Sequence, residues 1–199
     1  MKKYIQGAVI CLFLMPIVAV SVLALTNSFE HKDLPILGQL SHFSLQERKE
    51  DTVSLESLRG KAWIASFLFT NCGYQCPMMI EKLKKVQSAL RFKEKFRLIS
   101  ITVDPERDTT EALRRYATRI DADPFKWLFL TGNYDEIQEL AIKGFKLASG
   151  KEDNGNLIHS DRVVLVDGWG RIRGYYPITT DPEVKTLIKD AKRLIRDTF

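Results

Sequence analysis

The sequence predicts one α/β domain with a central mixed sheet flanked by helices, preceded by an N-terminal transmembrane anchor. Strand-like apolar runs alternate with helical patterns over residues 62–147, which indicates a parallel core sheet. A glycine-bearing turn over residues 167–170 then separates two β-rich runs and predicts an antiparallel pair at the edge. A nearly continuous apolar stretch covers residues 4–25 and predicts the anchor.

The N-terminal segment, residues 1–25, predicts a membrane location. Its apolar stretch just supplies the about 20 residues that cross a bilayer. Paired lysines at the start predict an N-terminus inside the cytoplasm and the rest of the chain outside it. A cleavable export signal ending near residues 22–24 is the alternative. Residues 26–35 are then a polar tether, and residues 36–199 form one domain.

Two cysteines follow the first long apolar run of the domain, residues 62–69, which is typical of a strand buried on both faces. Three residues separate Cys72 from Cys76, and Pro77 predicts that Cys76 stands just before a helix over residues 78–91. A helix N-terminus favours thiolate over thiol. The pair is therefore bridged, metallated or catalytic, and an inert disulfide closing so small a loop would add little stability.

The later elements complete a thioredoxin-like order. Asp104 is expected to form the turn after the second buried strand, and Asp108 with Glu111 fits a helix capping box. A cysteine loop directly after the first long buried strand is typical of a thioredoxin-like domain. The remaining predicted elements are an early hairpin over 42–61, strands at 96–103 and 127–130, helices at 112–120 and 134–147, strands at 163–166 and 172–176, and a last helix at 182–196.

Only a histidine could readily complete a site with the two thiolates. His31 lies in the tether and His42 in an early strand, whereas His159 immediately precedes the strand near residue 162. In a thioredoxin-like sheet the entry to that strand faces the cysteine loop. Two thiolates and one imidazole form a soft donor set that selects copper(I) over hard cations. Zinc remains open, although it would need a fourth ligand or water.

Other functional classes fit less well. Thioredoxin-type reductases usually have two residues between their cysteines and a facing cis-proline, but here no proline occurs between Pro124 and Pro177. Peroxiredoxins have threonine three residues before the reactive cysteine, where this chain has Phe69. The net charge of +5 comes with interleaved acidic and basic residues, and no nucleic-acid-binding motif accompanies it.

These motifs together resemble the Sco/SenC family of membrane-tethered, thioredoxin-like copper proteins. The resemblance implies that Cys72, Cys76 and His159 bind copper(I), and can also bind copper(II). It implies a metallochaperone that delivers copper to, or maintains the thiols of, the CuA centre in cytochrome c oxidase subunit II or another copper-receiving protein. The matching positions are Phe69-Thr70, Cys72, Cys76-Pro77, residues 101–109, residues 127–132 and His159.

The resemblance also bears on location and on enzymatic activity. A bacterial inner membrane with a single span is implied, with the C-terminal domain facing the periplasm. A thiol-disulfide oxidoreductase that keeps partner cysteines reduced is the alternative function. Both functions use Cys72 and Cys76, so the sequence leaves open whether the protein is an enzyme, and His159 discriminates between them.

Overall fold

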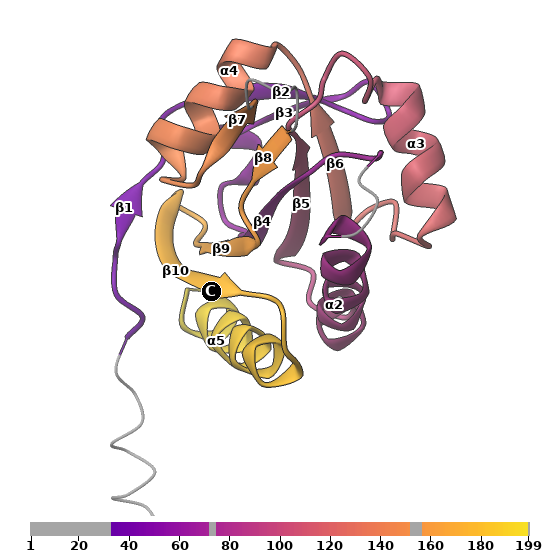
Figure 1. Cartoon of the computed structure of the whole chain (residues 1–199). Coiled ribbons are helices and arrows are strands. Elements are labelled where there is room, and N and C mark those ends of the chain that lie inside the picture. Colours follow the sequence, from indigo (N-terminus) through magenta and orange to yellow (C-terminus); the bar gives the residue numbers. More distant parts are fainter. Residues whose placement is uncertain (1–32, 72–74, 152–156, 199) are drawn as a thin grey trace, which may run out of the picture. The chain divides into compact units, whose positions relative to one another are not determined.

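A mixed sheet of eight strands organises the described part of the chain, residues 33–71, 75–151 and 157–198 of a computed structural model (Figure 1). The strands are β1 (Gly38–Gln39), β2 (Ser44–Glu47), β3 (Thr52–Ser54), β4 (Ala62–Leu68), β5 (Phe96–Thr102), β6 (Trp127–Thr131), β7 (Ser149–Lys151), β8 (Leu157–His159), β9 (Arg162–Val166) and β10 (Arg171–Pro177). The helices are α2 (Gln75–Leu90), α3 (Thr110–Arg119), α4 (Tyr134–Glu139) and α5 (Asp181–Thr198), with a 3₁₀ turn η1 (Glu56–Leu58) and a π-helical turn η2 (Leu140–Gly144). The strand order is β1-β10-β9-β4-β5-β6-β2-β3, and β7 and β8 form a separate pair.

The three central strands, β4, β5 and β6, run parallel, and the outer strands join them antiparallel. Leu68 at the end of β4 lies opposite Thr102 at the end of β5, so these strands end at one edge of the sheet. We call this end of the strands the carboxyl edge, and the opposite end, where β4, β5 and β6 begin, the amino edge; neither term refers to the outermost strands of the sheet. Every residue of β4 is buried, as expected for a parallel strand covered on both faces.

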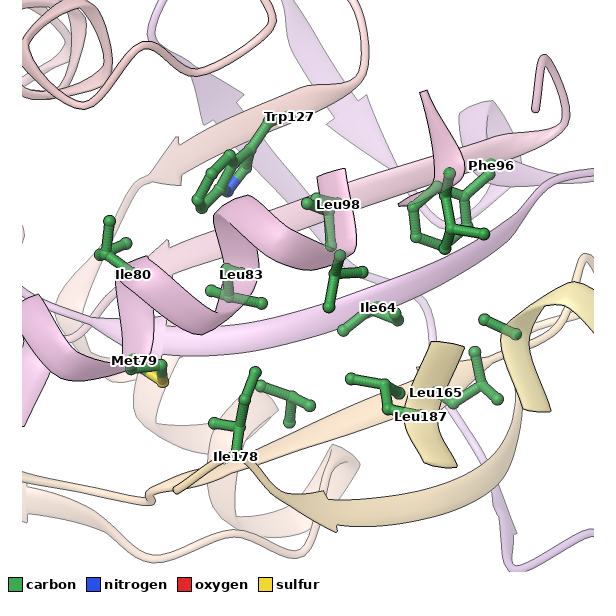
Figure 2. Close-up of a cluster of buried hydrophobic side chains, with 14 of the residues drawn as sticks. Ile64, Met79, Ile80, Leu83, Phe96, Leu98, Trp127, Leu165, Ile178 and Leu187 are labelled. Carbon is green, nitrogen blue, oxygen red and sulfur yellow. The ribbon is translucent and has the colours of Figure 1, made fainter. Parts of the chain in front are cut away.

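One face of the sheet is covered by α2, α3 and α5. Figure 2 shows Leu83 of α2 and Leu187 of α5 gathered with Ile64 and Leu165 of the sheet. All four side chains are almost completely buried. Burying a side chain of this kind stabilises the fold by about 1.5–3 kcal/mol. This core therefore holds α2, the helix that carries Cys76, firmly against the sheet.

A second core covers the other face, where α4 and η2 lie (Figure 1). The ring of Phe145, just after η2, meets Trp63 at 5.9 Å and Phe67 at 5.4 Å between ring centroids, both edge to face. Such aromatic pairs add to the stabilisation from burial alone. Trp63 and its neighbour Ile64 serve opposite cores because successive side chains of a strand alternate between faces.

The predicted mixed sheet and flanking helices are confirmed, but two helices differ in extent. Helix α2 begins at Gln75 rather than after Pro77, so Cys76 lies inside its first turn. The first four N–H groups of a helix have no partner within it, so a proline is tolerated there. The predicted helix over 134–147 is α-helical only to Glu139. It then widens into η2, where Phe145 N donates to Leu140 O at 2.8 Å.

The predicted anchor, residues 1–25, and residues 26–32 of the predicted tether lie outside the described residues. Within the described ranges, no helix is long and apolar enough to cross a bilayer. Leu34, near the end of the predicted tether, and Leu37 are hydrogen-bonded to β10. Arg173 Nε donates to Leu34 O at 3.1 Å, and Leu37 N donates to Ile172 O at 2.8 Å.

Candidate metal centre

The three predicted ligands fall in or beside parts of the chain that the structure does not describe. Cys72 lies outside the described residues. The backbone of Cys76 belongs to the first turn of α2, and the backbone of His159 ends β8, paired with Ser149 of β7. The side chains of Cys76 and His159 are not among those described, so the three-ligand set stays a prediction.

The topology brings the two described backbones to the same edge of the sheet. β4 ends at Leu68, and α2 begins seven residues later. β9 runs antiparallel to β4, with Ala65 opposite Val164, so β9 begins beside the carboxyl end of β4. His159 precedes the first residue of β9 by three positions. The start of α2, which includes the backbone of Cys76, and the entry to β9 therefore both lie at the carboxyl edge.

A buried carboxylate holds the start of the cysteine loop. Asp108 is completely buried, and its Oδ2 accepts from Thr70 N at 3.0 Å. The hydroxyls of Thr70 and Thr102 also donate to this carboxylate, each at 2.5 Å. Thr70 lies two residues before Cys72. One carboxylate thus ties the chain entering the cysteine loop to the end of β5 and to the turn before α3.

This arrangement corrects the predicted role of Asp108 as a helix cap. The cap of α3 is Thr109, whose hydroxyl accepts from Ala112 N at 3.3 Å. Glu111 instead pairs with Arg114 and Arg115 on the helix surface. Burial explains the difference, because an inward carboxylate must find donors in the interior, whereas a cap lies at the helix surface. The sequence signal for those donors was a threonine at, or just beyond, the end of each of two neighbouring parallel strands.

Asp104 forms the turn after β5, as predicted. Its backbone oxygen accepts from Asp108 N at 2.9 Å, and its own N–H donates to the hydroxyl of Thr102 at 2.9 Å. Its carboxylate accepts from Arg107 Nε at 2.5 Å and is nearly buried. These contacts give Asp104 a structural part in the same network that holds the cysteine loop.

A cleft of about 360 Å³ opens beside the entry to β9, lined among others by Lys146, Ser160, Arg162 and Tyr175. Burial raises the pKa of the Tyr175 hydroxyl, so this group is a neutral donor at ordinary pH. Two cationic side chains on one cleft attract anionic groups to this side of the carboxyl edge. Among the described side chains, no three histidine, cysteine or acidic groups lie together in a metal-binding cluster.

A mixed sheet flanked by helices, with a cysteine loop between its central strand and the next helix, defines the thioredoxin-like class. Within that class, the chain belongs to the SCO1/SenC family, whose sequence profile matches residues 38–196. The matched region includes Cys72, Cys76 and His159 and extends from β1 into α5.

Individual relatives agree with this assignment. The SCO1 protein homolog of Bacillus subtilis strain 168 is 34% identical over 161 residues, which cover 79% of this chain and 83% of that protein. The structure of BsSco, a member of the Sco family of cytochrome c oxidase assembly proteins, aligns with a TM-score of 0.74 at 32% identity, covering 84% of this chain and 99% of that chain. Yeast Sco1 with copper bound aligns with a TM-score of 0.66 at 26% identity, covering 78% of this chain and 89% of that chain. The described sheet and helices therefore form the thioredoxin-like fold of Sco proteins.

Proposed function

We propose that this protein binds copper and helps to deliver it to a receiving protein during assembly of cytochrome c oxidase. The observation that carries the proposal is membership of the SCO1/SenC family over residues 38–196, with both cysteines and the histidine present. Two relatives support it: yeast Sco1 was solved with copper bound, and BsSco belongs to a family of cytochrome c oxidase assembly proteins. The proposed recipient is the CuA centre of subunit II.

The proposed ligands are Cys72, Cys76 and His159. Two thiolates and an imidazole are the donors that copper(I) prefers, and copper(I) accepts three ligands. The backbone of Cys76 lies in the first turn of α2, where the partial positive charge of the helix favours the thiolate form. The donor set therefore fits copper(I) as cargo, and it also accommodates copper(II).

The redox state of the cysteine pair would control loading. A disulfide between Cys72 and Cys76 forms with loss of two protons and transfer of two electrons to an acceptor such as another disulfide. That bond removes two of the three ligands, so only the dithiol form takes up copper. Release then proceeds by ligand exchange, with thiolates of the recipient replacing those of this protein one at a time.

Thiol-disulfide exchange with a partner is the second candidate function. The disulfide switch identified in BsSco, which is 32% identical to this chain, favours considering it. In this reaction a thiolate of the pair attacks a partner disulfide, forms a mixed disulfide and is then displaced by the other thiolate. The partner is reduced and this protein is oxidised. Copper transfer needs His159, whereas thiol exchange does not.

A copper(I) titration of the reduced protein under a competing chelator tests the proposal. Every variant carries Cys11→Ser, because the chain has three cysteines and the third lies in the N-terminal segment. Cys72→Ser, Cys76→Ser and His159→Ala are each expected to lower copper affinity by more than the about 10–100-fold that outer-shell changes cost. His42→Ala is the matched control, because His42 is exposed and pairs with Glu56 at 3.2 Å. Unchanged affinity in His159→Ala would contradict the three-ligand site.

We also propose that residues 1–25 anchor the protein in a bacterial inner membrane, with residues 26–35 as tether and residues 36–199 as the copper-binding domain facing the periplasm. The apolar stretch and the paired lysines at the start support this arrangement. Alkaline extraction of membranes is expected to leave the protein in the pellet. Protease added to spheroplasts is expected to digest the domain, and a domain protected in that experiment would contradict the orientation.

A further inference from the structure

A second feature of the molecule lies at the amino edge, away from the cysteine loop. Two loops meet there: residues 91–95, before β5, and residues 123–126, before β6. Lys126 joins them, because its Nζ donates to Arg91 O at 2.6 Å and to Lys93 O at 3.4 Å. The two loops are thus held side by side as one surface.

Two phenyl rings stand out from this surface into solvent. Phe92 is 79% exposed and Phe125 is 75% exposed. A cation lies over each ring: the Arg91 guanidinium is 4.4 Å from the centroid of Phe92, and Lys49 Nζ is 4.9 Å from the centroid of Phe125. Single exposed apolar side chains are common, but two large rings on adjoining loops, each capped by a cation, form a patch of defined chemistry.

The two loops and Lys49 together carry five cationic and two acidic side chains. Glu94 pairs with Lys126 at 3.0 Å, and the carboxylate of Asp123 accepts from the backbone N–H groups of Phe125 and Lys126. These two acidic groups are thus engaged within the surface itself. We call it the Phe92–Phe125 surface; its charged members are Lys49, Arg91, Lys93, Glu94, Lys95, Asp123 and Lys126.

We propose that the Phe92–Phe125 surface lies against an anionic lipid bilayer. Phenyl rings flanked by lysine and arginine are typical of segments that rest in the headgroup region, where the rings enter the apolar boundary. Each lysine or arginine near such a surface is attracted by the negative headgroups. The proposal rests on the proposed membrane tether, which keeps the domain within reach of the bilayer, but it does not depend on copper binding.

This docking would orient the domain so that the candidate metal centre faces away from the membrane. The carboxyl and amino edges lie at opposite ends of the parallel strands β4, β5 and β6. With the amino edge on the bilayer, the start of α2 and the entry to β9 lie on the side away from it. The dithiol is then presented to partners that stand above the membrane and not to lipid.

Fluorescence quenching in lipid nanodiscs tests the proposal with the full chain. The chain has three tryptophans, of which Trp63 and Trp127 are fully buried and Trp169 is half exposed. A Trp169→Phe background therefore allows Phe125→Trp to serve as an exposed reporter on the surface. Glu106→Trp, in the exposed turn after β5, is the matched reporter at the carboxyl edge. Discs contain brominated phosphatidylcholine, either alone or mixed with an equal amount of phosphatidylglycerol.

The Phe125→Trp reporter is expected to be quenched in the anionic discs, less in the neutral discs, and less again when salt is raised. The Glu106→Trp reporter is expected to stay unquenched in both. Adding Lys93→Glu and Lys95→Glu is expected to abolish the extra quenching of this reporter in anionic discs relative to neutral discs. The control is Lys185→Glu with Lys192→Glu, on the exposed side of α5, which makes the same charge change elsewhere. It is expected to preserve the extra quenching in anionic discs.

Equal quenching of the two reporters, or no quenching of Phe125→Trp in anionic discs, would overturn the proposal and leave the surface to an acidic protein partner. A chain that associates with neither type of disc would overturn the membrane tether as well. Copper titration of the same disc preparations reports the proposed function separately, so the two failures are distinguishable.

Discussion

Two completely buried carboxylates at opposite edges of the sheet are satisfied by different chemistry. Asp167, in the turn between β9 and β10, is held by charge: its Oδ2 accepts from Arg171 Nε at 2.7 Å and from an Arg173 guanidinium nitrogen at 2.9 Å. Asp108, at the carboxyl edge, is held by the hydroxyls of Thr70 and Thr102 and by one backbone N–H. None of the ion pairs among the described residues includes Asp108.

This difference predicts how much stability each edge loses when its buried carboxylate is removed. Removing the carboxylate between two guanidinium groups leaves two cations, of which Arg173 is mostly buried, without their shared partner, which is costly. Removing a carboxylate from between hydroxyls leaves groups that can rotate toward other acceptors, which costs less. The turn at Asp167 is therefore a rigid closure of the sheet, whereas Asp108 holds the start of the cysteine loop through contacts that can be exchanged.

Asp167→Ala is expected to cause the largest loss, about 3–5 kcal/mol in the free energy of unfolding, because Arg171 and Arg173 lose their shared partner. Urea unfolding followed by fluorescence measures it. Asp181→Ala is the matched control, since Asp181 also pairs with two cations, Lys82 and Lys85, but is half exposed. Little change is expected there. A loss in Asp167→Ala as small as in the control would remove the contrast between the edges.

Acid should weaken the same turn. Burial alone would raise the pKa of Asp167, but hydrogen bonds from the backbone and guanidinium groups hold it below its ordinary value of 3.8. The folded state therefore binds fewer protons than the unfolded state, and this stabilisation is full above the unfolded pKa and is lost as pH falls through it toward the folded pKa. The native protein should lose stability between about pH 5 and pH 2 more steeply than Asp167→Asn. Parallel curves of unfolding free energy against pH would refute this.

Asp108→Ala is expected to cost less, about 2–3 kcal/mol, because it leaves Thr70 N and two hydroxyls without their acceptor. The effect should also be local. Hydrogen exchange at the Thr70 amide should accelerate more than exchange in β9, whereas Asp167→Ala should accelerate both edges through global unfolding. Asp108→Asn keeps one acceptor oxygen, so its loss of stability should fall between that of the native protein, which is zero, and that of Asp108→Ala. Uniform acceleration in Asp108→Ala would show that its role is not confined to the cysteine loop.

The sequence was sufficient for the central strands of the sheet and for its antiparallel pair β9–β10, because their signals are local and strong. Residues 62–69 are almost wholly apolar, and the turn before Arg171 carries glycine, so both the buried strand and the antiparallel pair could be predicted. Strand β1 could not be predicted, since it has two residues and exists only through pairing with β10. The π turn η2 was missed for a similar reason, because it depends on packing of Phe145 in the core.

Around the candidate site, sequence reasoning placed the segments along the sheet better than the contacts between them. The start of α2, which carries Cys76, and the segment from His159 into β9 both lie at the carboxyl edge. The capping role of Asp108 was wrong, because a capping pattern describes spacing within one helix. Its real partners are Thr70, two residues after β4, and Thr102, the last residue of β5. Such contacts between distant segments become visible only once the strand register is known.

The smallest expected effect sharpens the comparison most. Thr102→Val keeps the side-chain shape but removes the hydroxyl that donates to Asp108 and accepts from Asp104 N, so a loss of about 1–2 kcal/mol is expected. Thr102→Ser retains the hydroxyl and is the control. In double-mutant cycles, Thr102→Val should couple to Asp108→Ala by roughly 1 kcal/mol, and should add to Asp167→Ala within about 0.5 kcal/mol. Equal coupling to both carboxylates would mean that the two edges respond as one unit, and the distinction between a network held by charge and one held by hydroxyls would fail.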